Sequence, residues 1–409
     1  MDGPVRRIVK PDEDRVIIAG AGPAGCTVAL YLAQRGVDVL LLEAEATLPI
    51  DLRASTFHPP TLDMLDELGV TERMLPLGLI SPTYQYRDRR SGEAAVFDLG
   101  VLAGVTAHPY RLQCEQYKMT QVAVRMLEAL PTARVLFGHR VEQIEQHADR
   151  VVVHCETQDR GFVSFTGAYL VGTDGANSRV RKALCIDFEG FTYPERFLVV
   201  STAFDFAASL PNLSNVNYVS DPDEWCVLLR TPSLWRVLVP TDPDADETLL
   251  LSDAYIEERL QRIVPQTLAY EIGHRTLYRV HQRVARRYRS RRVLLAGDAA
   301  HINNPLGGMG MNGGLHDAFS LAAKLATILD GSGDDALLDL YERQRRGICI
   351  RFIQDQTIRN KQLMEERDPS AQAERQREFM RIAADPERAR AFLLRTSMIQ
   401  SLRDADAIA

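Results

Sequence analysis

The chain has 409 residues, of which 45% are hydrophobic and 25% are charged, and its formal net charge is -7 at pH 7. This length predicts about two or three lobes rather than one small core, and the composition is that of an ordinary globular protein. The negative charge balance argues against nucleic acid as a partner.

The six cysteines are scattered, without a CxxC pair or a His/Cys cluster. This spacing favours a reducing compartment and argues against a metal site or a disulfide framework. The N-terminal stretch MDGPVRRIVKPDED contains no apolar run, and no apolar run in the chain approaches the roughly 20 residues that span a bilayer. We therefore expect a cytoplasmic protein with neither a signal peptide nor a membrane span.

The first strong pattern is RVIIAGAGPAGCTVALYLAQRGVDVLLLEAEA, residues 15–46. A β-branched run at 16–19 predicts a buried parallel strand, and it leads directly into a GxGxxG pattern. A helix with Gly36 as its C-terminal cap follows, and a second strand at 37–42 ends in Glu43. The strand, glycine turn, helix, strand and acid together predict a dinucleotide-binding unit.

Each part of this unit has a physical role. Gly20 allows the tight turn, Gly22 lets the backbone approach a pyrophosphate, and Gly25 lets the helix pack closely on the strand. The helix N-terminus favours a phosphate group, and Glu43 can accept hydrogen bonds from a ribose diol. The motif alone does not distinguish NAD from FAD.

The middle of the chain predicts a second, antiparallel lobe. Residues 82–100 predict a hairpin, and the alternating hydrophobic pattern of 187–280 predicts strands separated by Pro, Asp and Ser turns. A helix is expected at about 249–263. We expect the hairpin to join the same sheet.

Two further acidic residues follow predicted strands, each beside a glycine. Asp174 follows the strand at 169–172, and Asp298 follows the strand at 293–296. Ligands gather at the carboxyl ends of strands in open α/β sheets, so both acids are expected near the dinucleotide. For Asp298, capping of the following helix is an equal alternative.

The segment GGMGMNGG, residues 307–314, opens a predicted helix and is either a surface loop or a backbone that approaches a ligand closely. The tail from Leu337 is helical and highly charged, which favours a solvated helix packed by one stripe.

These motifs, in this order, resemble the single-component flavoprotein aromatic hydroxylases, the para-hydroxybenzoate hydroxylase family. The resemblance rests on GAGPAG with its acid, the DG pair, and the GD pair followed by Pro305 and GGMGMN. The segments 51–70 and 111–124 are similar to further parts of that family, and the resemblance covers residues 15 to about 350. A second GxGxxG and a redox cysteine pair are both missing, which distinguishes the chain from two-dinucleotide disulfide reductases.

The resemblance implies an α/β fold: a Rossmann-type FAD-binding domain with an inserted antiparallel-sheet substrate domain and C-terminal helices. The implied boundaries are 1–81, 102–185 and 281–350 for the FAD-binding domain, 82–101 and 186–280 for the substrate domain, and 351–409 for the C-terminal helical segment.

The resemblance also implies the residues that bind FAD. They are Gly20, Gly22, Ala24, Gly25, Glu43, Arg53, Ala54, Arg111, Gln113, Asp174, Asp298, Pro305, Gly308, Gly310, Met311 and Asn312. Within this set, Arg53 would reach the diphosphate and Asp298 the ribityl chain. A surface ion pair is the alternative for Arg53, and a position on an amphipathic helix is the alternative for Gln113.

For the substrate pocket we expect Thr56, Tyr218, Trp225 and Arg230. Pro305 would form the environment of the reactive flavin edge, and Tyr218 and Arg230 are the catalytic candidates. The alternative is that the strand aromatics are core residues and Arg230 is on an exposed face. His301 is expected to be structural and bonded to backbone, and the role of His58 stays open.

The implied activity is that of an FAD-dependent monooxygenase of aromatic catabolism, with NADH or NADPH as a transient reductant and O₂ as co-substrate. It would hydroxylate a phenolic or hydroxylated N-heteroaromatic substrate, with or without a carboxylate, through a flavin C4a-hydroperoxide. A monomer or homodimer is expected. Two alternatives stay open: a flavin-dependent reductase or dehydrogenase of the same fold, and a non-enzymatic nucleotide-binding protein.

Overall fold

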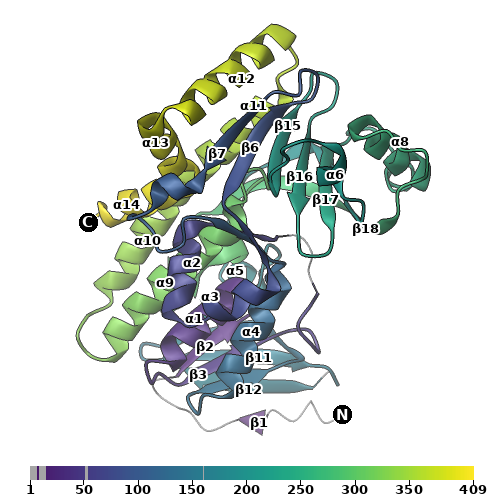
Figure 1. Cartoon of the computed structure of the whole chain (residues 1–409). Coiled ribbons are helices and arrows are strands. Elements are labelled where there is room, and N and C mark those ends of the chain that lie inside the picture. Colours follow the sequence, from purple (N-terminus) through teal and green to yellow (C-terminus); the bar gives the residue numbers. More distant parts are fainter. Residues whose placement is uncertain (1–6, 9–14, 51–53, 160) are drawn as a thin grey trace.

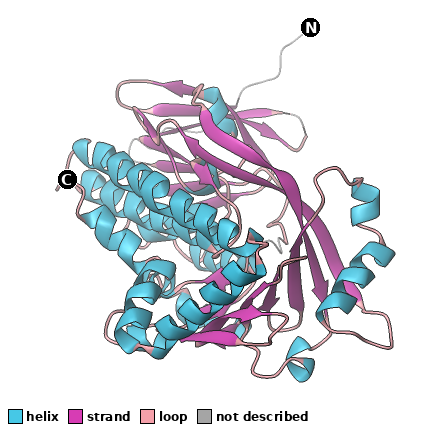
Figure 2. Cartoon of the chain, turned by 90° about the horizontal axis from the view of Figure 1, so that it is seen from above, coloured by secondary structure: helices cyan, strands magenta, loops and turns pink. Residues whose placement is uncertain are grey.

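The structure, a computed structural model, describes residues 7–8, 15–50, 54–159 and 161–409 (Figure 1). It has a Rossmann-type lobe, a large sheet above it and a layer of C-terminal helices (Figure 1). In the view from above, the helices gather on one side and the long strands cross the other (Figure 2). This arrangement confirms the predicted fold class, whereas the domain boundaries remain a prediction.

The Rossmann sheet has the strand order β19-β20-β13-β2-β3-β9 and is parallel except for the β19–β20 pair. The three adjacent strands β13, β2 and β3 are completely buried, which explains their continuous apolar runs. The strands are β2 (Val16–Ala19), β3 (Val39–Leu42), β9 (Ala133–Leu136), β13 (Tyr169–Gly172), β19 (Arg289–Ser290) and β20 (Val293–Leu295).

Helices α1 (Pro23–Ala33) and α9 (Met309–Leu329) pack against each other beside this sheet, and α4 (Gln116–Glu128) packs on α1. The expected strand, glycine turn and helix at the N-terminal end are confirmed. The same lobe carries the shorter helices α2 (Pro59–Glu67), α3 (Thr71–Met74) and α5 (Arg179–Ala183).

Two small sheets complete this lobe. One has the order β1-β12-β11-β10, with β1 (Arg7–Ile8), β12 (Phe162–Gly167), β11 (Val151–Thr157) and β10 (His139–Gln146). The other has the order β4-β8-β5, with β4 (Thr56–Phe57), β8 (Arg111–Gln113) and β5 (Leu79–Ser81). The central strand of the second sheet, β8, has all its side chains buried.

The large sheet has eight strands in the order β21-β18-β14-β17-β16-β15-β6-β7. The hairpin β6–β7 joins it, as predicted, by pairing β6 with β15 in parallel. The strands are β6 (Thr83–Asp88), β7 (Ala94–Asp98), β14 (Phe188–Thr202), β15 (Val216–Ser220), β16 (Cys226–Arg230), β17 (Trp235–Pro240), β18 (Ile272–Ala285) and β21 (His301–Ile302).

Helices α6 (Phe206–Ser209), α7 (Glu247–Leu250) and α8 (Asp253–Ile263) belong to this part, and the last two replace the single helix expected at 249–263. Ser252 follows the C-cap of α7, Leu251, and caps α8 by accepting a hydrogen bond from Tyr255 N.

The C-terminal tail is helical, but it is more than one solvated helix. It forms α10 (Ala336–Ile348), a π-helical turn at Cys349–Gln354, α11 (Asp355–Glu365), α12 (Pro369–Ala384), α13 (Pro386–Thr396) and α14 (Ile399–Asp406). Phe379 of α12 stacks on Tyr86 of β6 at 4.3 Å between ring centroids, and Phe392 of α13 stacks on Phe97 of β7 at 4.5 Å. The tail therefore covers the hairpin edge of the large sheet (Figure 1). Within the described ranges, no helix has the length and apolar character needed to cross a bilayer.

Candidate functional site

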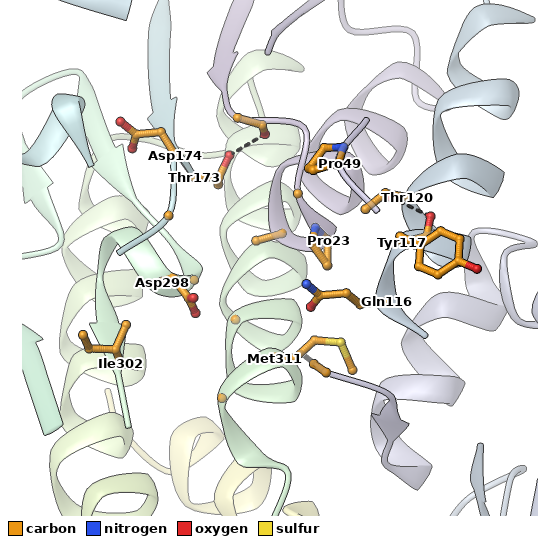
Figure 3. Close-up of a pocket in the computed structure, with 18 of the residues that line it drawn as sticks. Pro23, Pro49, Gln116, Tyr117, Thr120, Thr173, Asp174, Asp298, Ile302 and Met311 are labelled. Carbon is orange, nitrogen blue, oxygen red and sulfur yellow. Dashed lines mark hydrogen bonds between the residues drawn. The ribbon is translucent and has the colours of Figure 1, made fainter. Parts of the chain in front are cut away.

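A cavity of about 910 Å³ lies between the Rossmann lobe and the large sheet. This volume is at the upper end of the range for ligand pockets. In Figure 3, Asp298 and Ile302 lie on one side of it and Gln116 and Tyr117 on the other. Segments that are distant in the sequence, from Gly20 to Gly314, thus meet around one space.

The glycine turn after β2 forms one end of the cavity. Gly20 has φ +101°, and a Cβ atom there would lie 2.6 Å from the carbonyl oxygen of Thr173. A Cβ at Gly25 would lie only 1.9 Å from the carbonyl oxygen of Gly20. These contacts agree with the tight turn and the close helix–strand packing expected of the two glycines. Around Gly22, in contrast, the space within 4 Å of the Cβ position is open.

Glu43 follows β3 and lies beside this turn. One carboxylate oxygen accepts a hydrogen bond from Ala21 N at 2.8 Å, and the other accepts one from Glu45 N at 3.0 Å. The carboxylate is thereby held at the cavity edge, together with the N-terminus of α1 at Pro23. This combination suits a ribose diol and an adjoining phosphate.

Asp174 lines the cavity but also organises its own loop. Its carboxylate accepts hydrogen bonds from Ser178 Oγ at 2.5 Å, Arg179 N at 2.6 Å and Val180 N at 3.0 Å. Burial raises the pKa of Asp174, although these hydrogen bonds favour the ionised form. The acid thus fixes the start of α5 at the cavity wall.

Asp298 also lines the cavity (Figure 3). It lies in a 3₁₀ turn, Gly297–Ala299, that has no side-chain cap, and Gly308 stands at the N-cap of α9. The capping alternative considered for Asp298 is therefore wrong. Gly297 has φ +64°, which brings the turn next to α1, since a Cβ there would lie 3.0 Å from the Ala24 side chain.

The glycine-rich segment presents backbone to the cavity. Gly307 and Gly308 have φ +100° and +67°, and both line the space with Pro305, Gly310 and Met311. Left-handed backbone of this kind favours glycine, and it leaves the N-terminus of α9 uncovered by side chains. The segment is a wall of the cavity rather than a free surface loop.

Asn312 is buried behind this wall instead of lining it. Its amide donates to Thr56 O at 2.8 Å, and its carbonyl oxygen accepts from His58 N at 2.9 Å. The side chain therefore joins α9 to β4.

Arg111 and Gln113 do not line the cavity, contrary to expectation. Gln113 accepts a hydrogen bond from Thr56 Oγ1 at 3.0 Å, and the guanidinium of Arg111 lies 4.0 Å from the centre of the Tyr84 ring. All three residues of their strand, β8, are buried, so these side chains face packed interior.

In place of Arg111 and Gln113, the first turns of α4 supply Gln116, Tyr117 and Thr120 to the cavity (Figure 3). The i, i+4 spacing of Gln116 and Thr120 at a helix start is the signal that could have identified them. Ala54 and Thr56 line the cavity as expected, whereas Arg53 lies outside the described residues.

The large sheet forms the other wall. Tyr218 lies opposite Val227, Val227 opposite Leu238, and Leu229 opposite Arg236 in the strand register. Because side chains alternate along a strand, these residues share one face, and all of them line the cavity. The placement of Tyr218 is as expected.

Trp225 and Arg230 do not line the cavity. Trp225 packs edge-on against Phe197 at 5.5 Å, and the half-buried Arg230 is next to Leu229 in sequence and so faces the other side, 5.7 Å from the Trp235 ring. The arginine of the wall is Arg236, which is only 3% exposed. In the sequence, Arg236 alternates with Trp235 and Val237, and this pattern indicates that it lies on the opposite face of the strand from those two residues.

His301 does not line the cavity, and its partner is a carboxylate rather than the expected backbone. Its Nε2 lies 2.8 Å from Asp317 Oδ2, and Arg345 Nε donates to Asp317 Oδ1 at 2.8 Å. All three side chains are completely buried. Burial by itself raises the pKa of Asp317, but the charges of His301 and Arg345 outweigh it and hold that pKa below its usual range.

Comparisons with known proteins agree with this site. A family model described as FAD binding domain matches residues 13–356. A para-nitrophenol 4-monooxygenase from Pseudomonas sp. (strain WBC-3) is 35% identical over 391 residues, covering 93% of this chain and 94% of that protein. The 6-hydroxy-3-succinoylpyridine 3-monooxygenase HspB from Pseudomonas putida (strain DSM 28022 / S16) is 34% identical, covering 83% of this chain and 86% of that protein.

Among solved structures, p-nitrophenol 4-monooxygenase PnpA from Pseudomonas putida DLL-E4 superposes with a TM-score of 0.88 at 34% identity. The superposition covers 95% of this chain and 98% of that one.

Proposed function

Because this chain belongs to the FAD binding domain family and is an FAD-dependent aromatic monooxygenase, we propose that its substrate is a small phenol or hydroxylated N-heteroaromatic ring with an anionic or strongly polar substituent. The predicted family, cofactor and enzyme class are confirmed by the comparisons. The substituent preference is our proposal, and it rests on Arg236.

The proposal rests on the buried position of Arg236 in the cavity wall. This wall also contains the apolar Val227 and Leu238. Burial alone raises the pKa of the nearby Glu115 carboxylate, but the hydrogen bond and charge of Lys118, and then the charge of Arg236, lower it. An arginine in such a place can bind the two oxygens of a carboxylate or nitro group through two parallel hydrogen bonds, or a single phenolate oxygen through one. The apolar neighbours would pack on the ring and exclude water from it.

The residues present fit FAD at the opposite end of the cavity. The Gly20–Ala24 turn and Glu43 would hold the adenosine diphosphate part, because the backbone is open at Gly22 and the carboxylate is already oriented. The backbone of Pro305–Gly308 and the side chain of Asp298 would hold the flavin end. The bound flavin supplies the redox chemistry, with NADH or NADPH as reductant and O₂ as oxidant.

The relatives support the same substrate class. Two of them are named for p-nitrophenol and 6-hydroxy-3-succinoylpyridine, rings that carry a hydroxyl and a polar or anionic substituent. We propose that this chain hydroxylates such a ring while Arg236 holds the substituent and Tyr218 and Leu238 pack on the ring.

A substrate screen tests the proposal. Purified FAD-loaded enzyme is given NADH or NADPH, ¹⁸O₂ and a series of phenols and hydroxypyridines with nitro, carboxylate or no substituent. We expect substituted rings to stimulate nicotinamide oxidation and to acquire one labelled oxygen. Unlabelled product from every compound, or a clear preference for the unsubstituted rings, would contradict it.

Replacing Arg236 with methionine is expected to raise KM for an anionic substrate about tenfold or more, since a charge-assisted hydrogen bond contributes about 1.5–3 kcal/mol. FAD affinity should not change, because Arg236 lies on the sheet wall. Steady-state kinetics and flavin fluorescence titration measure the two quantities. Arg230→Met, on the opposite face of the sheet, is the matched control and should leave KM unchanged.

We also propose that the enzyme is cytoplasmic and that it is a monomer or a homodimer. Cell fractionation and sedimentation of the FAD-loaded enzyme test them.

A further inference from the structure

Three side chains next to the cavity form a buried cluster with polar atoms that lack hydrogen-bond partners. The atoms are Nε and Nη1 of Arg111, Nε2 of Gln113 and Nδ1 of His58. Arg111 is 2% exposed, and the other two side chains are fully buried. Buried polar atoms of folded proteins are nearly always paired, so a group of such atoms from three neighbouring side chains calls for a bound ion or water as partner.

The strand register brings the three residues of this Arg111 cluster together. Thr56 lies opposite Gln113, and Phe57 lies opposite Leu112 in the antiparallel pair of β4 and β8. Alternate residues of a strand share a face. His58 and Arg111 therefore lie on the same face as Thr56 and Gln113, which are hydrogen-bonded to each other. Thr56 lines the cavity, which places the cluster directly behind the cavity wall.

His58 also connects the cluster to the glycine-rich wall. Its Nε2 lies 2.9 Å from the carbonyl oxygen of Gly307. A carbonyl can only accept, so Nε2 carries the hydrogen and Nδ1 is the open atom of the neutral ring. His58 precedes α2, and Gly308 precedes α9, so the positive ends of two helix dipoles meet near this contact.

The charge of Arg111 is not balanced by the described residues. Its guanidinium forms no ion pair with their carboxylates and rests on the Tyr84 ring. Burial lowers the pKa of His58 well below its ordinary value, and Arg111 lowers it further, so His58 is neutral. Burial raises the pKa of Tyr84 to about 12, so that phenol is neutral too. Within the described part of the chain, one buried positive charge therefore lacks a counter-charge, which is costly.

We propose that the Arg111 cluster binds a small monovalent anion of halide size. Arg111 donates from Nε and Nη1 and Gln113 donates from Nε2, so three hydrogens face one anion. His58 stays neutral beside the anion and does not donate to it. A water molecule would fill the same place without balancing the charge.

The proposal gives the cluster a role at the cavity. An anion held by Arg111 and Gln113 stabilises the hydrogen bond of Gln113 to Thr56 and the contact of His58 with Gly307. Both Thr56 and Gly307 belong to the cavity wall. Halide binding therefore stabilises the folded enzyme.

Two measurements on the FAD-loaded enzyme test the proposal. Crystals grown in bromide are examined by anomalous scattering, and the Tm is measured while bromide replaces gluconate at constant ionic strength. We expect a bromide peak in contact with Arg111 and Gln113, and a Tm rise of about 1–3 °C at ten times the dissociation constant. No peak at this position, or density for water only, would overturn the proposal, as would a Tm independent of bromide.

Two variants make the test specific. Gln113→Glu keeps an oxygen for Thr56 and places a tethered carboxylate beside Arg111, so the protein should fold, and the bromide peak and the Tm increment should both disappear. Arg111→Met should remove the increment as well, and if it fails to fold, the glutamate variant decides alone. The exposed Arg134→Met is the control and should keep the increment. An increment that persists in the glutamate variant would show that bromide acts elsewhere and would overturn the proposal.

Discussion

Replacing Gly25 with alanine is expected to prevent the chain from forming its FAD-binding lobe. The new Cβ would lie 1.9 Å from the carbonyl oxygen of Gly20 and 2.6 Å from Thr173 Oγ1, so α1 would have to move away from β2. Overpacking of a core costs about 1–3 kcal/mol even where neighbours can shift, and here one neighbour is backbone. We expect a loss above about 3 kcal/mol in urea unfolding and no retained flavin.

Gly22→Ala provides the contrast within the same motif. Around Gly22 the protein leaves the space within 4 Å of the Cβ position open, so the apoprotein should unfold at the same urea concentration as the wild type. The methyl group would instead occupy space next to the helix N-terminus, and FAD affinity should fall about tenfold or more, which is about 1.4 kcal/mol. A stable, flavin-loaded Gly25→Ala protein, or wild-type affinity in Gly22→Ala, would contradict this assignment.

Asp317→Asn is expected to cause the second large effect. The carboxylate accepts hydrogen bonds from Arg345 and Gly297 N and contacts His301, and it is fully buried. The variant leaves the Arg345 charge buried without its counter-charge, which costs about 3–5 kcal/mol. Gly297 begins the turn that carries Asp298 to the cavity, so FAD affinity should fall together with stability. Urea unfolding and fluorescence titration measure both.

The pH dependence of unfolding gives a second test of Asp317. Although burial alone raises its pKa, His301 and Arg345 hold that pKa below its usual range in the folded state. The stabilisation is therefore fully present above the unfolded-state pKa of about 3.9, and it is lost as pH falls through the lower folded-state value. In Asp317→Asn this part of the acid destabilisation should disappear. Glu374→Gln, in an exposed ion pair with Arg377, is the control and should change nothing measurable.

His301→Ala separates a structural from a catalytic role in the same network. Asp317 keeps Arg345 as partner in this variant, so the stability loss should be smaller than in Asp317→Asn. If the variant kept its fold and flavin but oxidised nicotinamide without hydroxylating substrate, the structural assignment of His301 would be wrong.

The sequence by itself determined those features that depend only on residues close together along the chain. Gly20 and Gly25 could be assigned because a tight turn and a close helix–strand contact require glycine wherever they occur. The alternating pattern of 187–280 likewise predicted the antiparallel strands, since the period of two belongs to each strand alone. The same holds for the glycines at 307 and 308, whose left-handed backbone is a property of the turn itself.

Only the tertiary structure decided which side chains meet. Arg230 and Arg236 are both strand arginines, but the register of β16 with β17 points only Arg236 into the cavity. Gln113 is fully buried and bonded to Thr56, whereas Gln116, at the start of the next helix, lines the cavity. The face that a side chain presents depends on pairing with strands far away in the sequence, and a shift of one residue reverses it.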